Sequence, residues 1–493
     1  MVNLSLPSRT RGNVIRLAVL VLVVALLIPT VVSAFTHTPV GIQPGTIEER
    51  PDGRTLISAQ GFEERTATSS QKVTRVVSVS PGGLPQWTFR RSSGVRYFYD
   101  IDPLANGDVL ISAGHPNSSF IRYDPGAGER VWTERLDTDD THDVDLINGD
   151  ELLVADMRNY NGSADRNDDR IFVYNRTRDE IVWEFRFERI YNESDGGDYE
   201  DDWTHVNDVD KIGDGLYMAS PRNMDQVVVI NRSTKEVEMR LGSDGDHDVM
   251  HEQHNPQYFE GPNGTPTILV ADSENDRVVE YARTDGTWER TWTLGTGGKL
   301  NWPRDADRLP NGNTLVIDSL NHRVIEVTPE GQVVWEAYVS WGTYDAERVA
   351  IGEEPGGPTI RQQGASGSYE VSGSAQKTAG ASDRPTFADV LSDTFAGTPI
   401  SAEVDWFATR WSHIVPWIRP VWMSPWAFVS AATAVLLLLG WGGAELVVRR
   451  RRIADRARSL HPRLRRNLRS DGAGGATESA DATASDADGA DED

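Results

Sequence analysis

The chain has 493 residues, enough for two or three domains, and its hydrophobic content of 38% is that of a globular protein with a buried core. It carries 75 acidic against 49 basic residues, and only five of the basic residues are lysine. Such a surface repels phosphate, so nucleic acid is excluded as an expected partner, and it resembles the surfaces of proteins from salt-loving organisms. The lack of cysteine excludes disulfides and thiolate metal sites.

An uncharged, mostly aliphatic run at 17–35 follows a basic N-terminus at 1–16. The run is long enough to span a bilayer as a helix. A cleaved signal peptide is the alternative, because Val32-Ser33-Ala34 is an acceptable cleavage site. We expect a transmembrane helix or signal anchor here, with residues 1–16 in the cytoplasm.

A short phrase returns about every 40 to 50 residues within 45–351, and its fullest copy is Trp203-Thr204-His205-Val206-Asn207-Asp208-Val209-Asp210. A turn and three further strands follow most copies, which is the period of a β-propeller blade. The pattern predicts an all-β, six-bladed propeller. The first unit, 51–90, contains only three strands, so we expect 345–351 to supply its innermost strand and to close the ring without exposed edges.

Within the phrase, some positions repeat and one does not. Acidic residues such as Asp143 and Asp145 recur from unit to unit, so we interpret them as structural acceptors of hydrogen bonds from the neighbouring blade. The position before the acidic pair changes around the ring, and it holds Tyr99, His142, Asn207, His254, Arg304 and Tyr344. Because these residues open the innermost strands, we expect them at the mouth of the central channel. His205 lies on the same strand face as Asn207, and Arg222 is expected in a turn at the same mouth.

On these residues the chain resembles the arylsulfotransferases of the bacterial and archaeal arylsulfate sulfotransferase type. The order His142, His205 with Asn207, Arg222 and His254 carries the resemblance over about 51–351. The member that the chain resembles is membrane-anchored and haloarchaeal-like. The chain differs from the best-known members in lacking their N-terminal domain and disulfide and in being tethered at its end.

The resemblance implies a sulfuryl transfer from a phenolic sulfate ester, not from a nucleotide, to a phenolic acceptor. His254 is implied as the nucleophile that is transiently sulfurylated, with His142, His205 and Arg222 stabilising the anionic oxygens. Leaving-group protonation falls to His142 or His205 if either titrates near neutrality. Asn207, Tyr99, Arg304 and Tyr344 are expected to contact substrate, and neither a cofactor nor a metal is expected.

Two other functions are compatible with the residues. His142, His205 and His254 together leave one open position on a divalent metal, as in a metal-dependent hydrolase or lyase, although Arg304 at the same mouth would repel a cation. The segments Asn275-Asp276-Arg277-Val278-Val279 and Asn321-His322-Arg323-Val324-Ile325 look like the NHL class of propeller repeat, which would make the protein a binding module at the cell surface.

The C-terminal third predicts a membrane attachment. A Gly/Ser/Ala/Pro-rich stretch at 352–401 indicates a flexible linker, and 402–425 indicates a tryptophan-rich segment at the lipid interface. An apolar run at 426–448 predicts a transmembrane helix. Ten arginines follow between Arg449 and Arg469, so we expect the tail at 449–493, basic and then acidic and disordered, in the cytoplasm and the propeller outside the cell.

Overall fold

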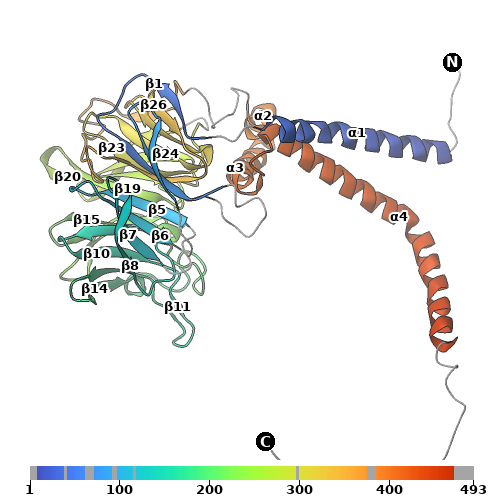
Figure 1. Ribbon diagram of the computed structural model, residues 1–493, viewed down its shortest axis with the longest axis horizontal. Helices are drawn as coiled ribbons and strands as arrows, with labels where there is room; N and C mark the ends of the chain where they lie inside the picture. The colour runs from blue at the N-terminus through green and yellow to red at the C-terminus, as the bar shows by residue number, and fades with distance from the viewer. Residues whose placement is uncertain are drawn as a thin grey trace, which may run out of the picture. The chain divides into compact units, whose positions relative to one another are not determined.

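The computed structural model describes residues 8–37, 41–61, 72–90, 97–114, 118–295, 299–374 and 385–470, with side chains from residue 12 to residue 450. The chain forms two units. One unit, within 36–425, contains the β-sheets, and the other is made by the two helical ends of the chain (Figure 1). Each unit is described by itself.

The larger unit is a six-bladed β-propeller of antiparallel sheets (Figure 1). From the innermost strand outwards, the blades are β27 (Thr343–Arg348), β2 (Thr55–Ala59), β3 (Arg75–Val79) and β4 (Pro85–Arg90); β5 (Tyr97–Pro103), β6 (Val109–Gly114), β7 (Ser119–Asp124) and β8 (Glu129–Arg135); β9 (Val144–Ile147), β10 (Glu151–Asp156), β13 (Arg170–Asn175) and β14 (Glu180–Arg186); β15 (Val206–Gly213), β16 (Leu216–Pro221), β17 (Gln226–Asn231) and β18 (Val237–Gly242); β19 (His254–Gly261), β20 (Thr265–Asp272), β21 (Arg277–Thr284) and β22 (Thr287–Leu294); and β23 (Pro303–Arg308), β24 (Thr314–Asp318), β25 (Arg323–Val327) and β26 (Val333–Tyr338).

The ring closes as the sequence predicts. The late strand β27 pairs with β2, with Leu56 opposite Glu347, and so completes the first blade. The repeating acidic residues accept hydrogen bonds from the backbone of adjacent blades: Asp345 Oδ2 lies 2.8 Å from the amide of Ile101, and Asp145 Oδ2 lies 3.0 Å from the amide of Lys211. Their structural interpretation is confirmed for these carboxylates.

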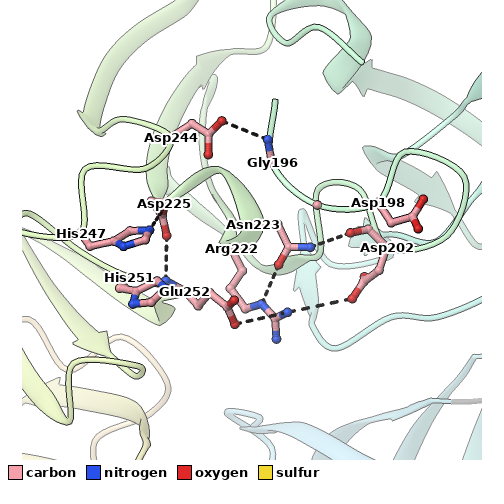
Figure 2. A pocket seen from close by; sticks show the side chains of 11 residues that line it. Gly196, Asp198, Asp202, Arg222, Asn223, Asp225, Asp244, His247, His251 and Glu252 are labelled. Atoms are coloured by element: carbon pink, nitrogen blue, oxygen red, sulfur yellow. Dashed lines mark hydrogen bonds and ion pairs between the residues drawn. The ribbon is translucent and has the colours of Figure 1, made fainter. Parts of the chain in front are cut away.

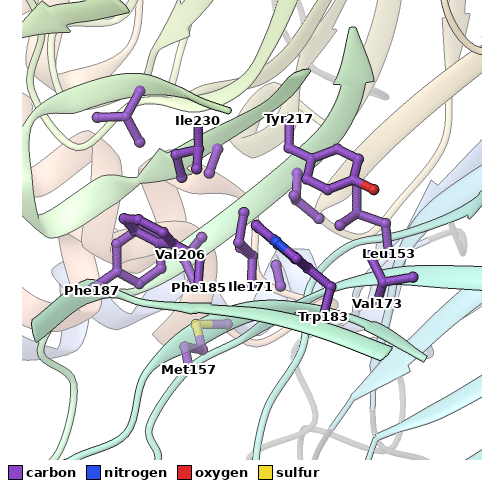
Figure 3. Close-up of a cluster of buried hydrophobic side chains, with 14 of the residues drawn as sticks. Leu153, Met157, Ile171, Val173, Trp183, Phe185, Phe187, Val206, Tyr217 and Ile230 are labelled. Atoms are coloured by element: carbon purple, nitrogen blue, oxygen red, sulfur yellow. The ribbon is translucent and has the colours of Figure 1, made fainter. Parts of the chain in front are cut away.

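Aromatic side chains join the blades. The core between the third and fourth blades contains Trp183, Phe185 and Tyr217 among aliphatic residues (Figure 3). The indole of Trp183 donates to the carbonyl of Arg232 in the next blade at 2.7 Å, and Trp335 donates to Pro81 at 2.9 Å. Each of these tryptophans therefore fills the gap between two blades and also satisfies a backbone carbonyl at its far side.

The propeller extends beyond its four-stranded blades. Strand β1 (Gln43–Ile47) adds to β26, and β28 (Gly367–Tyr369) pairs in parallel with β22. Part of the segment expected as a flexible linker at 352–401 is thus packed on the propeller. Ile360 is fully buried in the core between the fifth and sixth blades, and Val371 is 5% exposed there. Apolar residues are so sparse in this segment that the composition is that of a linker, but these two occupy core positions.

Two helices follow in the same unit, α2 (Phe387–Phe395) and α3 (Ser401–Ile418). Thr386 begins α2 with a capping box, in which its side chain accepts from the amide of Asp389 and the Asp389 side chain accepts in return. The tryptophan-rich segment expected at 402–425 is therefore largely helical.

The second unit contains α1 (Ser8–Thr36) and α4 (Pro425–Ser470). Within them, Gly12–Thr36 and Pro425–Arg450 are long and apolar enough to cross a membrane, which agrees with the two apolar runs of the sequence. Arg16 Nε lies 2.6 Å from Glu445 Oε1, so an ion pair joins the two helices. The acidic tail at 471–493 lies outside the described residues.

Candidate active site

Backbone bulges at the channel mouth position most of the expected site residues. In five blades the innermost strand carries one extra residue relative to its partner strand. The affected segments contain Tyr99, Asn207, Asn255, Arg304 and Tyr344. A bulge turns a side chain away from the regular alternation of a strand. In four blades the variable position of the repeat lies within such a bulge, which can aim a side chain into the channel. His254 borders the bulge of its blade, and His142 precedes a strand whose pairing is regular.

The backbone is also strained at this mouth. His205, Glu252 and Trp302 have φ values of 44°, 47° and 54°, a left-handed conformation that side chains disfavour. Each lies one or two residues before an innermost strand begins. Such residues persist where the surrounding structure holds them, and they gather at functional sites.

The structure brings the three expected histidines together with a tyrosine. The rings of His142 and His205 have centroids 5.0 Å apart. The ring of Tyr344 lies 5.5 Å from His142 and 6.2 Å from His254. Tyr99 packs on His142 at 3.8 Å between centroids and lies 5.0 Å from Tyr344. All five residues are buried, so the cluster is shielded from solvent.

Hydrogen bonds determine which nitrogen of His254 faces the channel. Its Nδ1 lies 2.8 Å from the hydroxyl oxygen of Ser273, and that hydroxyl donates to the carbonyl of Pro303 at 2.6 Å. The hydroxyl must therefore accept from Nδ1–H, which leaves the lone pair on Nε2. Nε2 has no hydrogen-bond partner among the described residues. Burial, and then the charges of Arg304 and Arg222, hold the pKa of His254 well below its usual range, which favours the neutral imidazole with a free lone pair on Nε2.

A carboxylate orients His205 in the same way. Asp202 lies 2.8 Å from His205 Nδ1, and Arg158 Nη2 lies 3.1 Å from the same carboxylate. The pKa of His205 is well below its usual range because of burial and the charges of Arg222, Arg158 and Arg304. The carboxylate of Asp202 accepts from Nδ1–H and so fixes the tautomer of His205. Because Arg158 compensates the charge of Asp202, the imidazole stays neutral.

The side-chain hydroxyl of Tyr344 holds His142. Its Nδ1 lies 3.1 Å from the hydroxyl of Tyr344, and its Nε2 lies 3.9 Å from a carboxylate oxygen of Asp140. Burial, followed by the charges of His205 and Arg304, lowers the pKa of His142 well below its usual range. For both His142 and His205 the pKa is shifted below its ordinary range, which favours the neutral imidazole and disfavours proton donation to the leaving group.

Arg304 is a buried cation without a carboxylate partner among the described residues. It is 5% exposed, its Nη1 donates to the side chain of Gln60, and its Nε has no acceptor. Its guanidinium lies 4.8 Å from the ring centre of Trp302 and 5.0 Å from that of Tyr344. Burial lowers its pKa to about 10, which still leaves it charged at neutral pH. A buried unpaired charge is costly unless an anion completes it, so this position is suited to an anionic ligand.

Arg222 connects the histidine cluster to an open pocket. It begins the short 3-10 helix η3 (Arg222–Met224), as expected for a turn at the mouth, and its Nη2 lies 3.5 Å from Glu252 and 4.0 Å from Asp202. Figure 2 shows this arginine between the two carboxylates, in a polar pocket of about 340 Å³. The pocket also contains Gly196 and His247, so the loops that precede the fourth and fifth blades form its rim.

Asn207 has a positioning contact. Its side-chain nitrogen donates to the carbonyl of Gln253 at 2.9 Å, which ties the fourth blade to the residue before His254. Its side-chain oxygen is buried without a donor among the described residues.

Several residues of the site were not identified from the sequence, among them Arg158, Gln60, Ser273 and Trp302. Gln60 and Ser273 follow the second strand of their blades, as Arg222 does in the fourth blade. The topological argument that located Arg222 therefore applies to them equally. Trp302 directly precedes the strand that carries Arg304, and it contacts helix α3, which no sequence pattern connected to the site.

The metal and NHL interpretations gain no support from the geometry. Among the described residues, the group whose ligand atoms converge for a metal is Asp102, Asp145 and Glu353, not the three histidines. In the NHL-like segments, the asparagine and arginine side chains bond back to a preceding aspartate: Asn275 and Arg277 to Asp272, and Asn321 and Arg323 to Asp318. This recurring turn is a structural feature of the blades.

The fold and the site together define a β-propeller with a cationic, histidine-lined channel mouth. The model of the arylsulfotransferase (ASST) family matches residues 84–285, which confirms the family resemblance over this segment. The segment includes His142, His205, Arg222 and His254.

Other comparisons are more distant. No curated protein matches the chain. A protein of unknown function from Bacteroides caccae is 13% identical, with 60% of this chain and 98% of that one covered and a TM-score of 0.42. A virginiamycin B lyase from Staphylococcus aureus is 12% identical, with 48% and 69% covered and a TM-score of 0.32. Likenesses at this level say nothing about activity.

Proposed function

We propose that this protein is an arylsulfotransferase-type enzyme that moves a sulfuryl group from a phenolic sulfate ester to a phenol through His254. The observation that carries the proposal is an imidazole whose Nδ1–H is held by Ser273, which leaves the lone pair on Nε2, together with the buried guanidinium of Arg304, which has no carboxylate partner among the described residues. The family match over 84–285 supports the same reaction class.

In the first step, the lone pair of His254 Nε2 forms a bond to sulfur while the bond from sulfur to the phenolic oxygen breaks. The phenolate leaves with that electron pair, and the imidazole carries the sulfuryl group as an N-sulfo-imidazolium with Nδ1–H still bonded to Ser273. In the second step, a phenol oxygen attacks sulfur, its proton goes to solvent or to the departed phenolate, and the imidazole is restored. Ordinary phenols ionise near pH 10, so departure without full protonation is feasible when cations are near.

The charged groups fit the equatorial oxygens of the transferring group. Sulfuryl transfer, like phosphoryl transfer, depends mainly on in-line placement and on donors aimed at these oxygens. Arg304 approaches from the sixth blade and Arg222 from the fourth, on either side of the blade that carries His254. A neutral His142 that accepts from the Tyr344 hydroxyl keeps its Nε2–H as a donor, whereas a neutral His205, whose Nδ1–H bonds to Asp202, presents a lone pair on Nε2.

We further propose that the reaction takes place outside the membrane. Two apolar helices flank the propeller, which is consistent with anchoring at both ends. Ten arginines between Arg449 and Arg469 favour a cytoplasmic C-terminus. Protease added to intact cells should then reach the propeller side and leave a C-terminal tag intact, and loss of that tag would contradict this orientation.

The activity test uses the full chain in detergent and high salt, with a chromogenic aryl sulfate and an excess of a second phenol. Release of chromophore that depends on the second phenol, together with sulfation of that phenol, supports the transferase. Release without an acceptor would instead indicate a hydrolase, and no release would remove the proposal.

A further inference from the structure

The deeper part of the propeller channel is lined by carboxylates. Each innermost strand runs on from the channel mouth. Five of the six carry the acidic residues of the repeat there, whereas β19 has Asn255, Pro256 and Gln257 at these positions. A small cavity of about 30 Å³ lies among them, lined by Asp100, Asp143, Asp208, Asp210, Asp305, Asp307, Asp345, Glu347, Glu353 and Glu354 together with Asn255, Pro256 and Gln257. No lysine or arginine lines it, so the negative charges face one another with no basic side chain between them.

Two of these carboxylates come from outside the repeat. After β27 leaves the mouth, the chain turns at its far end and places the half-buried Glu353 and the exposed Glu354 at the acidic end of the channel. The carboxylates of Glu353 and Asp145 lie in hydrogen-bonding contact. Two carboxylates in contact need either a proton or a cation between them.

Asp102 is the independent sign of a missing ligand. The residue is 2% exposed, and neither of its carboxylate oxygens accepts a hydrogen bond from an N–H or hydroxyl donor in the described chain. Its charged neighbours are Asp145, Asp143 and Asp345, and its carboxyl is also in contact with that of Asp100. Other acidic residues of the repeat, such as Asp345, receive a backbone amide, so the lack of a donor is a feature of this position.

We propose that the channel holds a calcium ion, with Asp102, Asp145 and Glu353 as its carboxylate ligands. Ligand atoms of the three residues lie within 4.8 Å of one another. Oxygens on opposite sides of Ca²⁺ are about 5 Å apart at the usual bond lengths, so one ion can bridge all three. An all-oxygen set favours a hard cation, and the dense carboxylates with room for little water favour Ca²⁺ over Mg²⁺, which keeps several of its waters.

The ion would also attach the segment that follows β27 to the propeller blades. Asp102 and Asp145 belong to the second and third blades, whereas Glu353 follows the closing strand β27. Calcium binding should therefore stabilise the closed propeller, since an ion bound only by the folded state raises the unfolding temperature. This inference does not depend on the proposed sulfuryl transfer, because its measurements concern the ion and not turnover.

The test uses the full chain in detergent, stripped with chelator and studied at constant ionic strength in potassium chloride. Titration calorimetry and thermal unfolding with Ca²⁺ should show one ion per chain and a raised unfolding temperature. Asp102→Asn and Glu353→Gln should each weaken Ca²⁺ binding by roughly tenfold or more, as expected when one charged ligand is lost. Glu353 lies after the closing strand, so Glu353→Gln should fold even if Asp102→Asn does not, and its Ca²⁺ affinity then decides the test.

The matched control is Glu354→Gln, which removes the same charge from the same channel at the next residue. It should change Ca²⁺ affinity much less than Glu353→Gln does, because Glu354 is not one of the three converging ligands. Equal weakening by the two variants would show general screening of an acidic channel and would overturn the site. Absence of Ca²⁺ binding to the parent protein would also overturn it.

Discussion

His413 of helix α3 and Trp302 of the channel mouth both donate to one carboxylate oxygen of Asp276. His413 Nε2 lies 2.9 Å from Asp276 Oδ1, and the backbone amide of Trp302 lies 2.7 Å from it. The two rings stack with centroids 6.0 Å apart and 17° between planes. Since Trp302 also lies under the guanidinium of Arg304, the helix that precedes the second apolar span is in contact with a wall of the candidate site.

This contact should depend on pH. Burial alone would lower the pKa of His413, but hydrogen bonds and charge attraction from Asp276 and Glu274 raise it to about 9. A raised pKa means that the contribution of His413 to docking is fully present below about pH 6.5, the ordinary value, and is lost as the pH rises through about 9. A second ion pair, from Arg410 Nη1 to Glu274 at 2.7 Å, also holds the helix, so loosening should be partial.

Single cysteines on α3 can measure this loosening, because the natural chain has none. Val415 is buried and the adjacent Ile414 is 52% exposed, so Val415→Cys reports undocking and Ile414→Cys is the matched control. As the pH rises from 7 to 10, the ratio of their thiol-labelling rates should approach one. The ratio is used because thiol ionisation raises both rates and therefore cancels. A constant ratio across this range would show that His413 does not hold the helix.

The repeat in the sequence predicted most of the propeller fold, and particular residues show why. Trp183 and Trp335 occupy the same place in their blades, because both blade interfaces need a large side chain there. The site residues were recognisable by their failure to repeat, as at His254 and Arg304. Contacts made by non-repeating segments had no such signal: Ile360 occupies a core position from within a stretch that has the composition of a linker. Which nitrogen of His254 faces the channel depends on its hydrogen bond to Ser273. Nothing in the sequence indicates that these two residues are in contact.

The buried position of Ile360 predicts a stability effect in the expected linker. Ile360→Ala removes a fully buried side chain from the core between the fifth and sixth blades and should reduce the free energy of unfolding by roughly 2 to 5 kcal/mol. Ile351→Ala, at a position 41% exposed, is the control and should cost far less. Denaturant unfolding of the full chain in detergent compares them, and equal midpoints would mean that residues after β27 do not contribute to the core.

Ser273 should matter through the tautomer of His254. Ser273→Ala removes the acceptor of Nδ1–H, so the imidazole loses one hydrogen bond, worth about 1 to 1.5 kcal/mol or roughly tenfold in rate. The loss should appear in kcat with little change in KM, because the residue does not reach the substrate. Ser78→Ala, at a buried serine of β3 whose hydroxyl has no partner among the described residues, should leave the rate unchanged. An unaltered kcat in Ser273→Ala would show that the serine does not orient the nucleophile.

Two arginines on β23 provide a contrast between an unpaired and a paired buried cation. Arg304 has no carboxylate partner among the described residues, whereas Arg308 Nη2 lies 3.3 Å from Glu280, and both side chains of that pair are fully buried. Arg308→Met leaves Glu280 unpaired and should cost roughly 3 to 5 kcal/mol of stability. Arg304→Met removes an uncompensated charge, so it should not destabilise the protein, and it should abolish stabilisation by added sulfate or aryl sulfate. Retention of that stabilisation in Arg304→Met would place the anion elsewhere.

The assignment of His254 as the nucleophile is tested most directly by comparison with Arg222. His254→Ala removes the lone pair that attacks sulfur, so it should abolish both turnover and the acid-labile sulfurylated intermediate that a labelled donor would leave on the chain. The fold should survive, because the imidazole faces the channel and its one side-chain partner is Ser273. Arg222→Ala keeps the nucleophile and removes a charge beside the developing oxygens, so the rate should fall by roughly 10² to 10³ while labelling still occurs at long times. Rapid quench with a labelled aryl sulfate, followed by peptide mapping at neutral or alkaline pH, separates the two outcomes. Full activity in His254→Ala would remove the nucleophile, and label recovered on another residue would reassign it.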